Sequence, residues 1–368
     1  MEGTVCLTML KAIHQVPCGP ALNACQRLMQ HFVVWLCSVN SSADLTLQNC
    51  VPPNVPSQIE GEWLWRLLQR EVAERPLLQR AQTIANLLPP AKLSLCTWAN
   101  NVSGLTQQFQ PIPPNAWPIN PPLARAVWVD FQTLMQSFYN KGLKSGLPYL
   151  SDGTLTPNGG VTYQQFVDQF RDAHRLNPNP EARETCVFCG GPLGQPEVDH
   201  WIGEGAYPIL AVSDDNLVPI CGECNSTTNK GQKPVHTAGS FVDWYHPYLR
   251  HTNGGLQLGY NLQQFSITVQ AGTVADQTKM NNLDRLLKLQ DRWTREFKAE
   301  YQKQLEKLRR SRNRGQGPIS IAELQNQLQK FQDDLVPSEP HNEVHEVLAQ
   351  AMLDPARVAS WQAELRIP

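Results

Sequence analysis

Apolar residues recur at spacings of three and four along much of the chain, and this spacing is typical of amphipathic helices. It predicts one helix from Leu22 to Cys37 and a second helical stretch from Glu60 to Leu88. Pro76 should interrupt the second stretch, because proline lacks a backbone donor. We therefore predict a helical N-terminal domain over residues 1–110.

The middle of the chain begins with a proline-rich segment. Prolines crowd between Phe109 and Pro122, where neither a regular helix nor a central strand is expected. Helical spacing resumes over 123–139 and 162–176. Thr162 stands three residues before Gln165, which is the sequence pattern of a capping box. Residues 111–180 are predicted to form a connector and helices.

The last part of the chain, residues 251–368, is predicted to hold a strand and C-terminal helices. Apolar and polar residues alternate near the end of 256–269, as in a half-buried strand. Apolar positions then keep helical spacing over 280–308, which predicts one long helix. Residues 319–365 also look helical.

A run of basic residues ends the predicted long helix. Cations at a helix C-terminus favour the helix dipole, so a solvated helix end explains the run, and a phosphate-contacting surface is the alternative. The run comprises Lys303, Lys307, Arg309, Arg310, Arg312 and Arg314.

Length and charge limit the class of protein. The chain has 368 residues, which suggests more than one domain, and a formal net charge of -2. Without a global excess of basic residues, any contact with nucleic acid must be local. No stretch of eighteen apolar residues and no basic region before an apolar stretch at the start are found. We expect a soluble cytoplasmic protein with no membrane contact.

The ten cysteines fall into two groups. Six are scattered, and we interpret most of them as small buried apolar residues. The other four form two Cys-x-x-Cys pairs, Cys186 with Cys189 and Cys221 with Cys224. Such pairs present the four thiolates that tetrahedral zinc prefers, whereas a disulfide framework would require an exported protein. A closed structural zinc site is predicted.

Two side chains suited to hydrolysis stand between the cysteine pairs. The run Glu197-Val198-Asp199-His200-Trp201 places a carboxylate beside an imidazole. A carboxylate binds hard divalent ions, and a histidine near neutrality can take a proton from water. Phosphodiester hydrolysis needs both groups.

The order of these motifs resembles the HNH endonuclease family. From Cys186 to Lys230 it reads Cys-x-x-Cys, Asp-His, Asn-Leu, Cys-x-x-Cys-Asn and Lys. The resemblance implies a ββα-metal, treble-clef-like HNH core within 181–250, with zinc knuckles, flanked by helical regions. The expected fold class is thus mainly α with a small α+β insert.

The resemblance also implies roles for single residues. His200 matches the general base that activates water, and Asp199 matches a ligand of the catalytic ion. Asn216 matches the middle residue of the motif, which braces the hairpin loop and orients the base. Asn225 matches the third position, where many members carry histidine, so that this chain is an HNN variant.

The second ligand of the catalytic ion is left open by the sequence. Asn229 lies four residues after Asn225, so the two amides would share one face of a helix. Mg²⁺ or Mn²⁺ suits a carboxylate, an amide oxygen and waters better than zinc does. Lys230 would hold a flanking phosphate. His246 and His251, behind this segment, are expected to be structural.

The function implied by the resemblance is metal-dependent cleavage of DNA, with RNA not excluded. Tyr207-Pro208 after the Asp-His pair is similar to a subgroup with members in bacterial anti-phage defence, where a separate sensor protein controls the nuclease. A regulatory partner is therefore implied as well. The alternatives are a non-catalytic zinc module that binds nucleic acid or protein, and a restriction-type enzyme whose helices read DNA directly.

Overall fold

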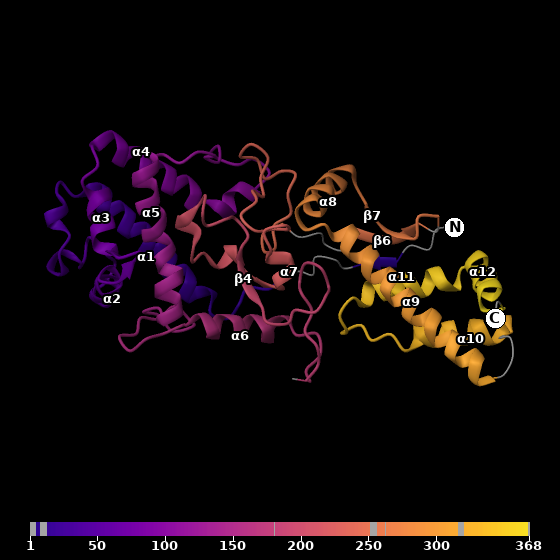
Figure 1. Cartoon of the computed structure of the whole chain (residues 1–368). Coiled ribbons are helices and arrows are strands. Elements are labelled where there is room, and N and C mark those ends of the chain that lie inside the picture. Colours follow the sequence, from indigo (N-terminus) through magenta and orange to yellow (C-terminus); the bar gives the residue numbers. More distant parts are fainter. Residues whose placement is uncertain are drawn as a thin grey trace.

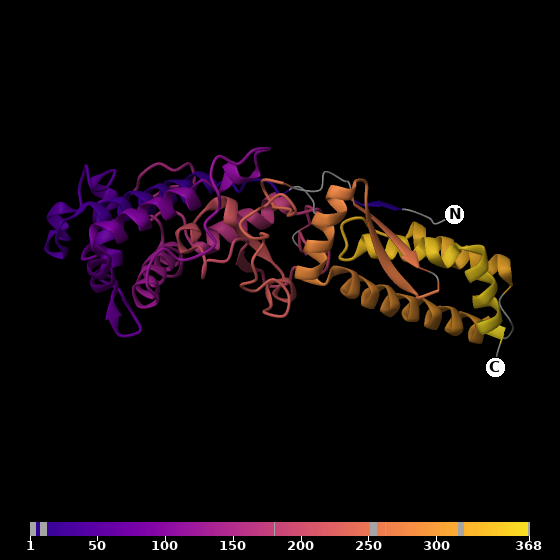
Figure 2. The ribbon, with the colours of Figure 1, turned by 90° about the horizontal axis from the view of Figure 1, so that it is seen from above.

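The computed structural model describes residues 5–7, 13–179, 181–250, 256–261, 263–315 and 320–366. The molecule is elongated, with the N-terminal helices at one end, the C-terminal helices at the other and the segment with the cysteine pairs between them (Figure 1). Figure 2 shows the same order from above. Helices dominate the described residues, and the sheets are small and antiparallel. The prediction of a mainly α protein with a small β part is confirmed.

The N-terminal part is built around α1, whose apolar face carries Leu28, Phe32 and Leu36 into the core. The predicted first helix is therefore confirmed. The helices of this part are α1 (Gly19–Ser38), α2 (Gln58–Leu68), α3 (Leu77–Ala85), α4 (Pro89–Ser103) and α5 (Arg125–Ser137), with short 3-10 turns at Ser42–Asp44, Leu47–Asn49 and Leu105–Phe109.

The second predicted helical stretch is two helices separated by a small hairpin. Strands β2 (Glu71–Val72) and β3 (Arg75–Pro76) pair antiparallel, and Ala73 and Glu74 at their turn have φ values of 51° and 59°. Such a turn reverses the chain, so that α3 starts in a new direction. Arg75 and Arg80 each place a guanidinium nitrogen 2.7 Å from an Asp130 carboxylate oxygen, which ties the hairpin and α3 to α5.

The connector and the following helix agree with their sequence patterns. Residues 110–124 form neither helix nor strand. Helix α5 continues into a π-helical turn (Phe138–Leu143). Helix α6 (Tyr163–His174) begins with the predicted capping box between Thr162 and Gln165.

The described residues of the C-terminal part form a three-stranded sheet and five helices. The sheet has the order β1-β6-β7, from β1 (Val5–Leu7), β6 (Leu256–Asn261) and β7 (Ser266–Ala271). Val5 pairs with Leu258, so Val5–Leu7 lies in the C-terminal part rather than with residues 13–110. The helices are α8 (Val274–Leu287), α9 (Leu289–Gly315), α10 (Ile321–Asp333), α11 (Asn342–Leu353) and α12 (Pro355–Arg366).

The long helix predicted over 280–308 is broken once. Lys288, between α8 and α9, has φ 52° and ψ 44°, the left-handed conformation. The flanking residues Leu287 and Leu289 are both buried, so packing on either side of the break keeps the apolar spacing intact. The single-helix prediction is wrong at this residue.

The basic run at the end of α9 is partly paired within the protein. Lys303 lies 2.9 Å from a Glu300 oxygen, Arg310 lies 3.2 Å from a Glu306 oxygen, and Arg312 donates to the carbonyl of Leu365. The side chain of Arg314 lies outside the described part. These pairs agree with the interpretation of the basic run as a solvated helix end.

In the part of the chain that the structure describes, none of the helices has both the length and the apolar character needed to cross a membrane.

Candidate functional site: a four-cysteine cluster beside a buried Asp-His pair

Two short strands and one helical turn carry the predicted site residues. Strands β4 (Glu197–His200) and β5 (Leu217–Ile220) pair antiparallel, with Asp199 opposite Val218 and His200 opposite Leu217. Between them lie 3-10 turns at Pro208–Leu210 and Asp214–Asn216, and α7 (Gly222–Asn225) follows β5. The hairpin therefore brings the Asp-His pair next to the segment that leads into the second cysteine pair.

The four paired cysteines converge on one point. The Sγ atoms of Cys186 and Cys224 are 3.9 Å apart, those of Cys189 and Cys221 are 3.8 Å apart, and all four lie within 4.8 Å of one another. At the usual zinc–sulfur distance of about 2.3 Å, two sulfurs of a tetrahedral site are about 3.8 Å apart. The four buried thiols thus have the spacing of a structural zinc site and could hold that ion.

Tight turns and helix α9 support this cluster. The Cys186 amide donates to the Gly191 carbonyl, and Gly190 adopts φ 67°, which glycine accepts without strain. From α9, Arg292 donates to the Cys224 sulfur at 3.2 Å, and the indole nitrogen of Trp293 donates to the Cys189 carbonyl at 2.9 Å. An arginine beside thiolates offsets their negative charge. No sequence motif pointed to these two residues, because they follow the second cysteine pair by a long stretch of chain.

The ring of His200 is buried and held in one orientation. Its Nε2 lies 3.0 Å from the carbonyl oxygen of Ala211, and Tyr139 packs edge-on against the ring. A carbonyl oxygen can only accept, so Nε2 carries the proton and Nδ1 keeps the free lone pair. Burial lowers the pKa of His200 to about 4, which keeps the ring neutral at pH 7. A neutral ring with a free Nδ1 is the form that can accept a proton.

Asn216 braces the loop that supplies this carbonyl. Its side-chain oxygen accepts from the Ile202 amide at 2.6 Å, and its nitrogen donates to the carbonyls of Ile202 and Leu210 at 3.0 and 3.2 Å. Leu210 directly precedes Ala211, the partner of His200. The fully buried amide therefore holds the loop that carries the carbonyl partner of the imidazole.

Asp199 faces a lysine inside the protein. Its Oδ2 lies 3.6 Å from Nζ of Lys230, and the two residues are 4% and 0% exposed. Burial raises the pKa of Asp199 to about 6, and the lysine charge opposes that rise. Nζ also donates to the carbonyls of His200 and Gly231, each at 3.1 Å. In this structure Lys230 is an internal partner of Asp199, not the surface contact for phosphate that the sequence suggested.

The two candidate amides lie apart from this pair. Helix α7 ends at Asn225, so Asn225 and Asn229 do not share a helix face, and that expectation is wrong. Asn225 donates to a Glu197 carboxylate oxygen at 2.8 Å, and Asn229 donates to the Glu223 carbonyl at 2.7 Å. Among the described residues no hydrogen bond joins either amide to Asp199.

One acidic residue of the site was missed from the sequence. Glu204 follows His200 in an irregular loop, and its Oε2 lies 3.4 Å from His200 Nε2. Burial raises the pKa of Glu204 to about 7, with Lys144 opposing the rise. A spacing of four residues from His200 was the only available signal, and outside a helix that spacing carries no information on contact.

No model of a protein family, no curated protein and no solved structure matches this chain. The fold and the site define a mainly helical protein with a cysteine cluster able to hold zinc and a buried group of Asp199, His200 and Lys230 beside it.

Proposed function

We propose that the protein is a metal-dependent endonuclease of the HNH type that hydrolyses phosphodiester bonds of DNA. One observation carries the proposal: Asn216 holds the carbonyl of Leu210, the next carbonyl holds Nε2 of His200, and Nδ1 is thereby left as the proton acceptor. An inert zinc module has no need to fix the tautomer of a buried histidine through an asparagine.

The side chains divide the chemistry between them. His200 takes a proton from water through Nδ1, and the water oxygen becomes the nucleophile. Asp199 would hold Mg²⁺ or Mn²⁺, since its Oδ2 is buried without a hydrogen-bond partner; Asn225 or Asn229 would need to rotate to add an amide oxygen. Such an ion stabilises negative charge on the phosphate and the leaving oxygen.

The described state is closed. Asp199 and His200 are 4% and 7% exposed, and the Lys230 ammonium already lies beside Asp199. A phosphodiester reaches His200 only after the loop between β4 and β5 or the segment around Lys230 has moved. The purified chain should therefore cleave DNA slowly, and a partner that favours the open state, like the sensor proteins of anti-phage systems, should raise the rate.

The first test is cleavage of supercoiled plasmid by the purified full chain with Mg²⁺, Mn²⁺ or a chelator. We expect nicking that requires the divalent ion and falls at least about 100-fold in His200→Ala, because a general base contributes that much or more. His31→Ala is the matched control, since His31 is exposed on α1 and should leave nicking unchanged. Equal ion-dependent cleavage by the wild type and His200→Ala would rule out this assignment.

The second candidate is a zinc module that binds nucleic acid or protein without cleaving it. The Lys230 charge beside Asp199 favours this candidate, because it neutralises the carboxylate without any divalent ion. Lys230→Met separates the two. In the nuclease this change frees Asp199 and tightens Mn²⁺ binding in a titration, whereas the binding module gains no Mn²⁺ affinity.

A further inference from the structure

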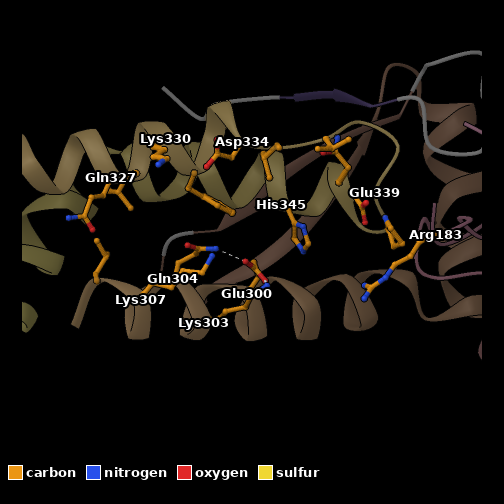
Figure 3. A pocket seen from close by; sticks show the side chains of 17 residues that line it. Arg183, Glu300, Lys303, Gln304, Lys307, Gln327, Lys330, Asp334, Glu339 and His345 are labelled. Carbon is orange, nitrogen blue, oxygen red and sulfur yellow. Dashed lines mark hydrogen bonds and ion pairs between the residues drawn. The ribbon is translucent and has the colours of Figure 1, made fainter. Parts of the chain in front are cut away.

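A second group of metal-binding side chains lies between two C-terminal helices. Glu296 and Glu300 stand one turn apart on α9, and His345 projects from α11, which packs against α9. One donor atom from each residue lies within 4.8 Å of the other two. In Figure 3 the side chains of Glu300 and His345 approach each other from facing elements.

The separations between donor atoms are close to those of a bound ion. Nε2 of His345 lies 3.0 Å from Oε1 of Glu296. With metal bonds of about 2.0 to 2.1 Å, two ligand atoms of a tetrahedral zinc site are about 3.3 Å apart. Small rotations of these side chains would therefore suffice to admit an ion.

A second histidine supports the same carboxylate. His341 lies one turn before His345, and its Nε2 is 4.0 Å from Oε2 of Glu296. The His341 amide donates to the Gly190 carbonyl at 2.7 Å, which fixes the start of α11 against the first cysteine pair. Ligating carboxylates are commonly oriented by such a partner outside the ligand set.

The surroundings differ from those of an ordinary surface ion pair. Glu300 is buried. Its Oε2 lies 2.9 Å from Nζ of Lys303, and its Oε1 accepts from Nε2 of Gln304 at 2.5 Å. Two imidazoles, one from the N-cap and one from the first turn of α11, converge on Glu296, and Nδ1 of His341 is buried without a partner. Glu300 and His345 also line a pocket of about 600 Å³ between α9, α10 and α11. An ion held by them would have one position open to that pocket.

We propose that Glu296, Glu300 and His345 form a binding site for a divalent transition-metal ion, for which zinc is the probe, with His341 orienting Glu296. One imidazole and two carboxylates are a donor set that zinc accepts, and three protein ligands leave a position for water. The site is separate from the four-cysteine cluster. It ties α11 to α9, the helix that supplies Arg292 and Trp293 to that cluster.

The experiment measures zinc per chain in the full-length protein after equilibration with buffered free zinc. We expect two ions per chain in the wild type and one in His345→Ala and in Glu300→Gln. Glu306→Gln is the matched control, because Glu306 lies on the same helix in an exposed pair with Arg310 and should leave two ions. One ion in the wild type, or two in both site variants, would overturn the proposal.

Cobalt distinguishes the two sites by their donors. Thiolate ligands give cobalt a strong near-ultraviolet charge-transfer absorption, and imidazole and carboxylate ligands do not. His345→Ala should keep this absorption while binding one cobalt fewer than the wild type.

Should the variants fail to fold by circular dichroism, the wild type alone decides. A thiol-blocking reagent should then release one zinc, and a second should leave only when a chelator is added. Release of all zinc by thiol blocking contradicts a site without cysteine.

Discussion

At the scale of single residues, Asn216 is the residue on which the arrangement of the site depends most. Its amide is completely buried and makes three hydrogen bonds to the backbone of the loop between β4 and β5. Removing the side chain would take the partner from the Ile202 amide and from the carbonyls of Ile202 and Leu210. The loop and the His200 ring should therefore lose their fixed positions together.

We predict that Asn216→Ala lowers the free energy of unfolding by about 2 to 3 kcal/mol, since buried donors and acceptors would be left unpaired. Urea unfolding followed by circular dichroism measures the change. Asn225→Ala is the control, because its bond to the exposed Glu197 should change the free energy by no more than about 0.5 kcal/mol. Equal losses in the two variants would show that the brace is not what holds the loop.

At the scale of elements, the break between α8 and α9 shows how packing overrides periodicity. The left-handed Lys288 donates to the Asp284 carbonyl, and the Asp284 side chain accepts from the Gln290 amide at 2.8 Å, near the start of α9. Asp284 in the last turn of α8 thus caps the start of α9. Because the apolar spacing runs through the break, only these contacts distinguish two helices from one.

This geometry predicts opposite effects of glycine at two lysines. Lys288→Gly should stabilise the protein by up to about 1 kcal/mol, because glycine adopts the left-handed conformation without steric cost. Lys298→Gly, at an exposed position inside α9, should destabilise it by about 1 kcal/mol. Thermal unfolding measures both changes. A loss of stability in Lys288→Gly as large as that in Lys298→Gly would mean that the helix is continuous in solution.

At the scale of the whole molecule, His246 joins the segment behind the cysteine pairs to the last 3-10 turn of the N-terminal part. Its ring is completely buried against Phe109, and its Nδ1 accepts from the amides of Tyr248 and Leu249. Arg250 donates to the Phe109 carbonyl at the same contact. Burial, together with the smaller effect of the Arg250 charge, lowers the pKa of His246 to about 3.

The lowered pKa of His246 makes the folded protein less stable at low pH. The unfolded chain takes up a proton on His246 near pH 6.5 and the folded protein does not, so stability is present above pH 6.5 and is lost as the pH falls. We predict that the wild type loses about 2 kcal/mol more than His246→Asn between pH 7 and pH 5. Asparagine keeps an acceptor for the two amides but does not titrate. Urea unfolding measures the free energy at each pH. An equal loss in the wild type and His246→Asn would show that His246 does not cause the loss of stability at low pH.

Several features of the protein followed from the sequence alone. Helical periodicity located α1, α5 and α6, the pattern at Thr162 and Gln165 gave a capping box, and the two cysteine pairs gave a cluster that could hold zinc. The helices, the capping box and each cysteine pair are local signals, because each involves residues within a few positions of one another. The two pairs are linked only by the preference of zinc for four thiolates. The nuclease function stays a proposal built on the same local motifs.

Tertiary structure decided what distant segments do to one another. It placed β1 beside β6, Arg292 and Trp293 on the cysteine cluster, Lys230 against Asp199, and two glutamates of α9 opposite a histidine of α11. It also turned one predicted helix into two at Lys288. None of these contacts has a fixed spacing in the sequence, because each depends on how completed elements pack, and the free energy of burial responds to the area covered rather than to distance along the chain.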